Sequence, residues 1–132
     1  TTDKDGDLIQ IDTKGNLTKS NLNLRSGHTI DMTSKSLVSF SENNLLIKGI
    51  PVVLPFGNYT PPKIHYLNNT IYVTLTDLDT QKVYAYYSNG TAVNGFPVYG
   101  NSKVDLTNAD DDKAIEMVVQ SETNSFLIYQ IN

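Results

Sequence analysis

The sequence contains no cysteine and no tryptophan, and Arg25 is its single arginine among 132 residues. Without cysteine, the chain forms no disulfide, has no thiol nucleophile and offers no thiolate ligand to a metal. The lysines are scattered and the net charge is −4, so the clustered cations that bind nucleic acid are missing. No apolar run approaches the roughly 20 residues of a membrane-spanning helix. These absences argue against a nucleic-acid partner and against a helical membrane span.

Sustained helical periodicity is absent as well, and the apolar runs are rich in β-branched and aromatic residues, which favour strands. One short strand pattern recurs four times, at LIQID (8–12), LLIKG (45–49), VYAYY (83–87) and FLIYQ (126–130). The spacing of roughly 35 to 45 residues is typical of repeat proteins, and repeats of this size made of short strands predict β-propeller blades. The expected fold is therefore all-β, a partial β-propeller of about three to four four-stranded blades.

The predicted units are a partial blade over residues 1–25, whole blades over 26–60 and 61–100, and a partial blade over 101–132. The third unit is the clearest, with strands at 63–67, 70–76 and 82–87. Its Asn89-Gly90 turn predicts positive φ at both central positions, and Pro97 marks an edge strand. Because closed propellers have at least about four blades, we expect a C-terminal fragment of a larger protein. Such a chain would self-associate or pack against the rest of its parent.

Alternation of side chains along each strand predicts which residues form the core. On the second strands we expect burial of Leu37, Phe40, Ile71, Val73, Leu75, Ile115, Val118 and Val119. On the third strands we expect burial of Val83, Ala85, Leu127 and Tyr129.

Three segments carry a resemblance to known propeller families. Residues 1–17, in which Asp12 follows a strand and meets a turn at Gly15, resemble the repeat unit of PQQ-like propellers. Residues 108–119 (NADDDKAIEMVV) are similar to the D-x-D-x-D-G-x-x-E-[IL]-V loop of FG-GAP and VCBS propellers. Residues 89–98 (NGTAVNGFPV) resemble the NGxxxxGFP segment repeated in large propeller proteins of Bacteroidetes-type bacteria. The resemblance implies a bacterial cell-envelope or extracellular protein. Some relatives carry the label ribonuclease HII, a chemistry that these residues do not support.

The loop at residues 108–116 is the strongest candidate for a binding site. Its alternating oxygen donors suit Ca²⁺, which takes about six to eight hard oxygen ligands. The expected donors are the Ala114 carbonyl and the side chains of Asn108, Asp110, Asp112 and Glu116. Lys113 replaces the glycine of the family motif, and it brings a Cβ to a position that often needs positive φ. The alternative is a polar turn, in which Asp and Asn side chains cap the backbone.

Two other acidic groups have structural explanations that we favour. Asp3, Asp5 and Asp7 alternate like metal ligands, but they lie at a chain end, where solvated carboxylates are common. Asp77 and Asp79 form a pair that suits acid–base catalysis, but aspartates in blade loops commonly form turns.

The histidines and tyrosines are weaker candidates again. His28 and His65 come from different units and could meet near the propeller axis on a metal, but no other ligand pattern accompanies them. A sugar- or peptide-binding surface could be presented by Tyr72, Tyr84, Tyr86, Tyr87 and Tyr99. Alternation places about half of these inside, so core packing explains most of them.

Two functions of different classes follow from these residues. The first is a non-catalytic binding or scaffold module whose ligand, a protein or a carbohydrate, lies on the loop face of the propeller. The second is an accessory domain of an enzyme whose active site lies outside this segment, such as a PQQ-type dehydrogenase or a protein labelled ribonuclease HII. An enzyme fragment would add a convergent cluster of His, Arg or carboxylate groups, and no such cluster can be assembled from the sequence.

Overall fold

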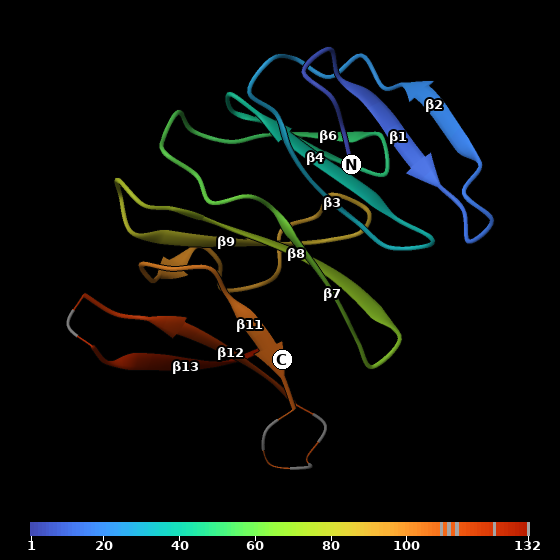
Figure 1. Cartoon of the computed structure of the whole chain (residues 1–132). Coiled ribbons are helices and arrows are strands. Elements are labelled where there is room, and N and C mark those ends of the chain that lie inside the picture. The colour runs from blue at the N-terminus through green and yellow to red at the C-terminus, as the bar shows by residue number, and fades with distance from the viewer. Residues whose placement is uncertain (109, 111, 113, 123, 132) are drawn as a thin grey trace.

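Every regular element of the described residues is a β-strand. The computed structural model describes residues 1–108, 110, 112, 114–122 and 124–131, and within them thirteen strands form four antiparallel sheets (Figure 1). The first sheet is a hairpin of β1 (Asp7–Ile11) and β2 (Leu17–Asn21). The expectation of an all-β chain is confirmed.

The other three sheets are meanders in which each strand pairs with the next one in sequence. One sheet consists of β3 (Thr29–Met32), β4 (Leu37–Ser41), β5 (Asn44–Ile47) and β6 (Ile50–Val53). The next consists of β7 (Lys63–Leu67), β8 (Thr70–Asp77), β9 (Lys82–Tyr87) and β10 (Val98–Tyr99). The last consists of β11 (Asp105–Thr107), β12 (Ile115–Gln120) and β13 (Phe126–Ile131). Among the described residues this last sheet therefore has three strands where its neighbours have four.

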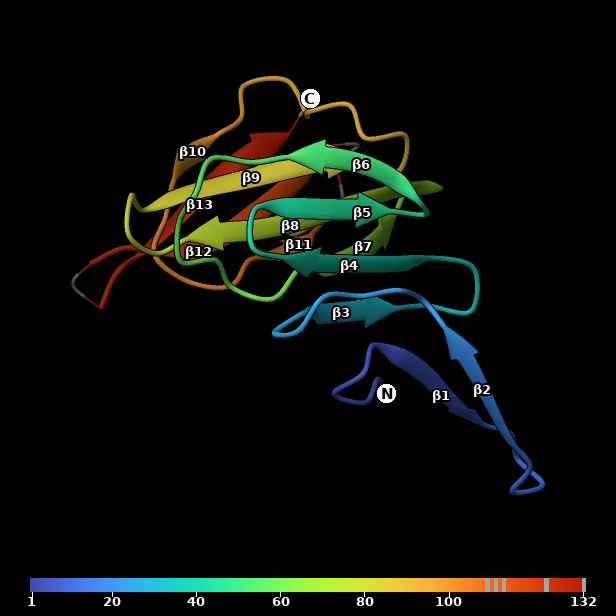
Figure 2. The same ribbon diagram turned by 90° about the horizontal axis from the view of Figure 1, so that it is seen from above.

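Two apolar cores hold these three sheets in a stack, in which the sheets lie one below another in Figure 1 and overlap when seen from above in Figure 2. The core between the β3–β6 and β7–β10 sheets contains Val38, Phe40, Leu45, Ile47, Val73, Leu75 and Tyr86. The core between the β7–β10 and β11–β13 sheets contains Tyr72, Val83, Ala85, Ile115, Met117, Val119 and Ile131. Neighbouring residues of β8, such as Tyr72 and Val73, thus enter opposite cores, because side chains alternate between the two faces of a strand.

The first strands of the three sheets, β3, β7 and β11, lie side by side. The Asp31 carboxylate on β3 accepts a hydrogen bond from the Ile64 main-chain N–H on β7 at 2.6 Å. Lys63, also on β7, pairs with the Asp105 carboxylate on β11 and donates to the Val104 carbonyl at 3.4 Å. Side chains on the first strand of one sheet therefore form hydrogen bonds with main-chain groups at the first strand of the next. We call this line of contacts the inner seam.

Two tight turns of the β7–β10 sheet differ in their geometry, and one of them departs from the prediction. Asn68 and Asn69 join β7 to β8 with φ values of 48° and 59°, which is the type I′ geometry favoured in hairpins. At the Asn89-Gly90 turn only Gly90 has a positive φ, of 81°. The Gly90 N–H donates to the Tyr87 carbonyl at 2.9 Å, so the turn spans residues 87–90 and Gly90 follows its central pair. The expected positive φ at Asn89 was wrong because the turn lies one residue earlier.

The predicted core is correct where a strand is covered on the expected face. Burial is confirmed for Phe40, Val73, Leu75, Val83, Ala85, Ile115 and Val119. Only partial burial is found for Leu37, Ile71, Val118, Leu127 and Tyr129. Leu37 and Ile71 border open hollows, and Val118 pairs with Ile128 on a face that no other sheet of the described residues covers. Alternation predicts which face a residue is on, but not whether a second sheet covers that face.

No helix of the described residues is long and apolar enough to cross a membrane.

Candidate metal centre

The loop between β11 and β12 is organised by its own polar side chains. The Asn108 side-chain amide donates to the Asp112 carbonyl at 2.5 Å. Asp110 accepts a hydrogen bond from the Asp112 N–H at 3.3 Å, and Asp112 accepts one from the Ala114 N–H at 2.5 Å. The loop folds this way because Asp and Asn side chains readily bond main-chain groups a few residues away. Lys113, expected at the glycine position of the motif, lies outside the described residues.

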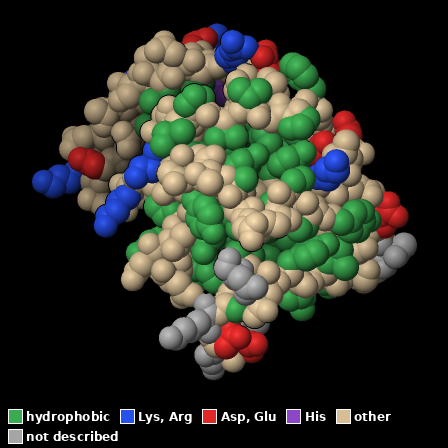
Figure 3. Space-filling model, turned by 180° about the vertical axis from the view of Figure 1, so that it is seen from behind, with side chains coloured by type: hydrophobic (Ala, Val, Ile, Leu, Met, Phe, Trp, Pro, Cys, Tyr) green, Lys and Arg blue, Asp and Glu red, His purple; other side chains and the backbone are tan. Residues whose placement is uncertain are grey.

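Three carboxylates converge at this loop. One oxygen each from Asp110, Asp112 and Glu116 lies within 4.8 Å of the others. The two aspartates are exposed, whereas Glu116 on β12 is buried, with 8% of its surface exposed. Figure 3 shows acidic side chains gathered at the lower end of the molecule, where Figure 1 places this loop. The expected side-chain donors Asp110, Asp112 and Glu116 are therefore brought together.

Asn108, the fourth side chain expected as a donor, allows a test of whether a cation fits here. The Asn108 Oδ1 atom is buried and has no hydrogen-bond partner among the described residues. A buried carbonyl oxygen without a partner is unfavourable, and a bound cation is one way to satisfy it. Amide and carboxylate oxygens are the hard donors that Ca²⁺ takes. These side chains therefore supply donor atoms of the type that Ca²⁺ takes, and the carboxylates of Asp110, Asp112 and Glu116 are the ones that converge.

The charge distribution also favours a cation at this end of the chain. Residues 101–132 contain two lysines and six acidic residues, and so carry a net charge of −4. The whole chain has the same net charge of −4, so residues 1–100 are neutral in sum. The excess negative charge is thus concentrated in the unit that holds the converging carboxylates.

In the other acidic loop, at residues 3–7, the carboxylates pair with a lysine side chain of the same chain. The Lys19 ammonium lies 3.0 Å from Asp3 and 2.7 Å from Asp7. Asp3 also accepts hydrogen bonds from the N–H groups of Asp5 and Asp7 at 3.0 Å. The Asp7 N–H and then Lys19 lower the pKa of Asp3, and the two carboxylates raise the pKa of Lys19. This loop is closed by an internal ion pair rather than being a simple solvated end.

The two histidines form hydrogen bonds with different parts of the chain. His28 is hydrogen-bonded through Nε2 to the Thr2 hydroxyl and through Nδ1 to the Arg25 carbonyl, each at 2.8 Å. His65 on β7 is buried, and its Nε2 lies 2.9 Å from the Thr74 hydroxyl. Burial lowers the pKa of His65 to about 4, with Lys63 as a second cause. Neither histidine belongs to the one group of possible metal ligands found among the described residues.

Asp77 acts as a turn former in the structure. It is 1% exposed, and its Oδ1 accepts from the N–H groups of Asn58 and Asp79 at 3.3 and 3.1 Å. Its Oδ2 accepts from the Thr80 hydroxyl at 2.5 Å. Gly57 lies so close that a Cβ there would meet the carboxylate at 2.7 Å. Both oxygens of Asp77 accept hydrogen bonds from nearby loop residues, in agreement with the turn-forming role that the sequence favours for it.

The tyrosines mostly pack between sheets. Tyr72 and Tyr86 are buried, and the rings of Tyr72 and Tyr87 are 5.5 Å apart. Tyr84 contacts Tyr59 with ring centroids 5.9 Å apart. Tyr99 is 39% exposed, and its carbonyl accepts a hydrogen bond from the Tyr129 hydroxyl. These contacts support core packing rather than a tyrosine-lined binding surface.

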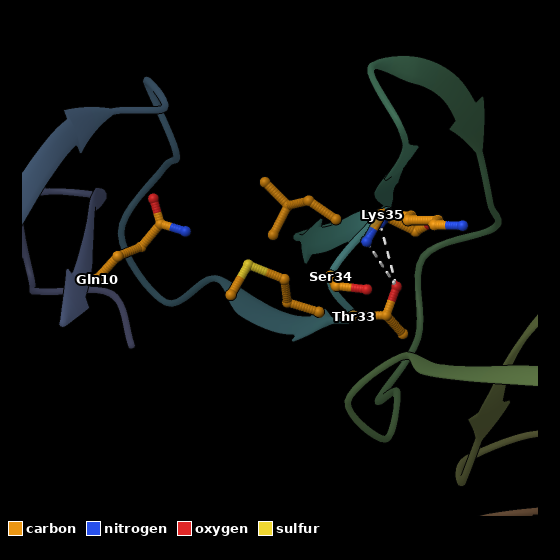
Figure 4. A pocket seen from close by; sticks show the side chains of 7 residues that line it. Gln10, Thr33, Ser34 and Lys35 are labelled. Atoms are coloured by element: carbon orange, nitrogen blue, oxygen red, sulfur yellow. Dashed lines mark hydrogen bonds between the residues drawn. The ribbon is translucent and has the colours of Figure 1, made fainter. Parts of the chain in front are cut away.

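A hollow of about 480 Å³ lies beside the β3–β4 turn (Figure 4). Gln10 of the β1–β2 hairpin faces the turn residues Thr33, Ser34 and Lys35 across it. Thr33 Oγ1 accepts hydrogen bonds from the N–H groups of Lys35 and Ser36, which fixes the turn. Hydroxyl, amide and ammonium groups around an apolar floor suit contact with a ligand, but they include no acid–base pair.

No family model, curated protein or solved structure matches the chain. The family resemblance therefore rests on the residue motifs alone. Sequence reasoning missed Lys19 in the first acidic loop and the ion pair of Lys63 with Asp105 in the inner seam. Lys63 and Asp105 are 42 positions apart, so only the stacking of two sheets brings them together, and no local pattern in the sequence signals it.

Proposed function

We propose that this chain is part of a β-propeller that serves as a non-catalytic binding or scaffold module in a larger bacterial protein. The observation that carries the proposal is the order of the three sheets in the stack and the way in which their first strands meet. Three meander sheets follow one another in sequence, and their first strands are the ones that lie side by side at the inner seam. Sheets that meet along their first strands are typical of propeller blades around an axis. The resemblance to PQQ-like, FG-GAP and VCBS repeats supports the same proposal, and with it we propose a cell-envelope or extracellular location.

The non-catalytic part of the proposal rests on how the candidate groups are used. Asp77 is occupied by its loop, His65 by Thr74, and the Asp3 loop by Lys19. The carboxylates of Asp110, Asp112 and Glu116 converge and suit a cation, and we include a structural Ca²⁺ site in the proposal. The alternative is an accessory domain of a dehydrogenase or nuclease, and no observation on the described residues favours it.

The fold can be tested by an experimental structure of the chain. Successive sheets related by a constant rotation about one axis along β3, β7 and β11 would support the propeller. Sheets stacked in parallel without a common axis would contradict it.

The activity can be tested with an RNA·DNA hybrid in Mg²⁺ or Mn²⁺. We expect no cleavage, because residues 101–132, which hold the converging carboxylates, carry a net charge of −4 and lack the clustered cations that bind a phosphate backbone. Cleavage that co-purifies with the protein and disappears in Asp110→Asn would overturn the non-catalytic proposal.

A further inference from the structure

Another hollow, of about 310 Å³, lies where the β3–β4 turn faces the β7–β8 hairpin. Figure 1 shows that these two turns lie at the same end of their sheets. The two sheets are neighbours in sequence and each has four strands, so both walls of the hollow are formed within the described chain. Its volume is at the lower end of the range found for small-molecule sites. The lining residues are Thr33, Ser34 and Lys35 of the turn and Ile64, Tyr66 and Ile71 of the hairpin.

The hairpin wall of the hollow is apolar and continues the core outward. Ile71 lies two residues before Val73 on β8, so both side chains are on the face toward the β3–β6 sheet. Val73 is fully buried in the core there, whereas Ile71 is only partly buried, and its cross-strand partner Tyr66 is 64% exposed. The Tyr66 hydroxyl donates to the Asn69 Oδ1 atom at 3.0 Å, which holds the ring beside the hairpin turn. An exposed aromatic ring beside isoleucine suits the apolar body of a ligand.

The turn wall of the hollow supplies hydrogen-bond donors. Thr33 Oγ1 accepts hydrogen bonds from the N–H groups of Lys35 and Ser36 at 3.3 and 3.1 Å, so the hydroxyl proton is left to be donated to a ligand. The Ser34 hydroxyl and the Lys35 ammonium come from the same turn. Among the described residues, no carboxylate forms an ion pair with Lys35. Three side-chain donors, one of them charged, therefore lie opposite the apolar wall.

The charge of the lining favours an anion of low charge. The residues around the hollow include one lysine and no acid. Asp31, two residues before the turn, is held by main-chain donors, since it accepts from the N–H groups of Met32 and Ile64 at 2.9 and 2.6 Å. One lysine balances the single charge of a carboxylate, whereas a phosphate monoester carries about 1.5 to 2 negative charges. A carboxylate also accepts strong charge-assisted hydrogen bonds from an ammonium group.

We propose that this hollow binds a small carboxylic acid with an apolar or aromatic body. Lys35 and the hydroxyls of Thr33 and Ser34 hold the carboxylate, and the body packs on Tyr66 and Ile71. The site rests on the proposed function as a binding module and names the chemical class of its ligand.

The test follows the titration of the whole unmodified chain by NMR at about pH 7, where carboxylic acids are ionised. The probe is 3-phenylpropionate. The matched controls are 3-phenylpropanamide, which has the same body without the charge, and acetate, which has the carboxylate without the body. We expect the acid to bind at least about fivefold more tightly than either control, and more weakly as NaCl is raised. Signals of Ile64, Tyr66 and Ile71 should shift, with nuclear Overhauser effects between the phenyl protons of the probe and the Ile71 methyl groups.

Two lysine variants locate the charged contact. Lys35→Met keeps the main-chain N–H that fixes the turn and removes only the ammonium, so it should weaken binding of 3-phenylpropionate at least about fivefold. Lys82→Met is the matched control. Lys82 is exposed and pairs with Asp77, at the opposite end of β8 from Ile71. This second variant should bind the probe as tightly as the unmodified chain does.

Several results would overturn the proposal. One is equal binding of the acid and the amide, which would leave Lys35 without a role. Another is equal weakening in the two lysine variants, which would indicate attraction to net charge alone. A third is the absence of shifts at Ile64, Tyr66 and Ile71 in the unmodified chain. None of these results bears on the propeller fold or on the absence of catalysis, which the experimental structure and the cleavage assay test separately.

Discussion

The β7–β10 and β11–β13 sheets have the same strand order but different surroundings. The first packs against a sheet on each face, so both Val73 and Val83 are fully buried. The second packs on one face only, which leaves Ile128 mostly exposed. Both strands β9 and β13 read as apolar and aromatic in the sequence. The comparison shows that the role of a strand residue is set by the neighbouring layer as much as by its own alternation.

The largest expected effect contrasts the two sheets directly. Leu75 on β8 is 1% exposed and lies in a core, so Leu75→Ala should reduce the free energy of unfolding by about 2–5 kcal/mol through lost burial and a cavity. Ile128→Ala on β13 should reduce it by less than about 1 kcal/mol, because its side chain is already exposed. Urea unfolding of both variants measures the difference. Equal losses would mean that Ile128 is covered in solution.

The next largest effect concerns His65, the buried histidine on β7. The pKa of His65 is lowered to about 4 in the folded chain, so the unfolded chain binds the proton more readily. Stability is therefore full above about pH 6.5 and falls as the pH drops toward 4, by up to roughly 3 kcal/mol. Unfolding curves between about pH 7 and pH 5 should show this loss for the unmodified chain and for His28→Gln, but not for His65→Gln. A pH dependence that survives in His65→Gln would place its origin elsewhere.

The comparison also shows what could be read from the sequence. The strand patterns at 70–76, 82–87 and 126–130 were predicted nearly as found, because each is a run rich in apolar and aromatic or β-branched residues. The acidic loop was predicted because Asp110, Asp112 and Glu116 are close in sequence. The inner seam was not predicted, since Asp31 and Ile64, which contact each other there, are 33 positions apart in the sequence. Contacts between sheets depend on how layers stack, which a single sequence does not encode in any short pattern.

A smaller effect is expected from calcium at the end of the β11–β13 sheet. If Ca²⁺ binds the folded chain only, a concentration about tenfold above its dissociation constant adds about 1.4 kcal/mol, or a few degrees in melting temperature. Asp110→Asn combined with Asp112→Asn should abolish the shift, and Asp5→Asn in the first acidic loop should retain it. Calorimetry at millimolar Ca²⁺ measures it. An equal shift in the double variant would reject the site.

The smallest effect concerns the ion pair that joins the two sheets at the inner seam. The side chains of Lys63 and Asp105 are 43% and 78% exposed, and exposed pairs contribute less than about 1 kcal/mol. Lys63→Met should therefore change stability little. Lys63 lowers the pKa of Asp105, so the same variant should raise that pKa toward the ordinary aspartate value, as measured by NMR. An unchanged pKa would show that the pair does not persist in solution.

The layered packing also bears on how the chain loses its structure. Both apolar cores join sheets that are neighbours in sequence. In such linear arrays, stability is approximately the sum of each unit and of its contacts with adjacent units. The β11–β13 sheet has one such interface and the β7–β10 sheet has two. We therefore expect unfolding of these three sheets to begin at the outer ones, and the β7–β10 sheet to be the last to exchange its amide hydrogens with solvent.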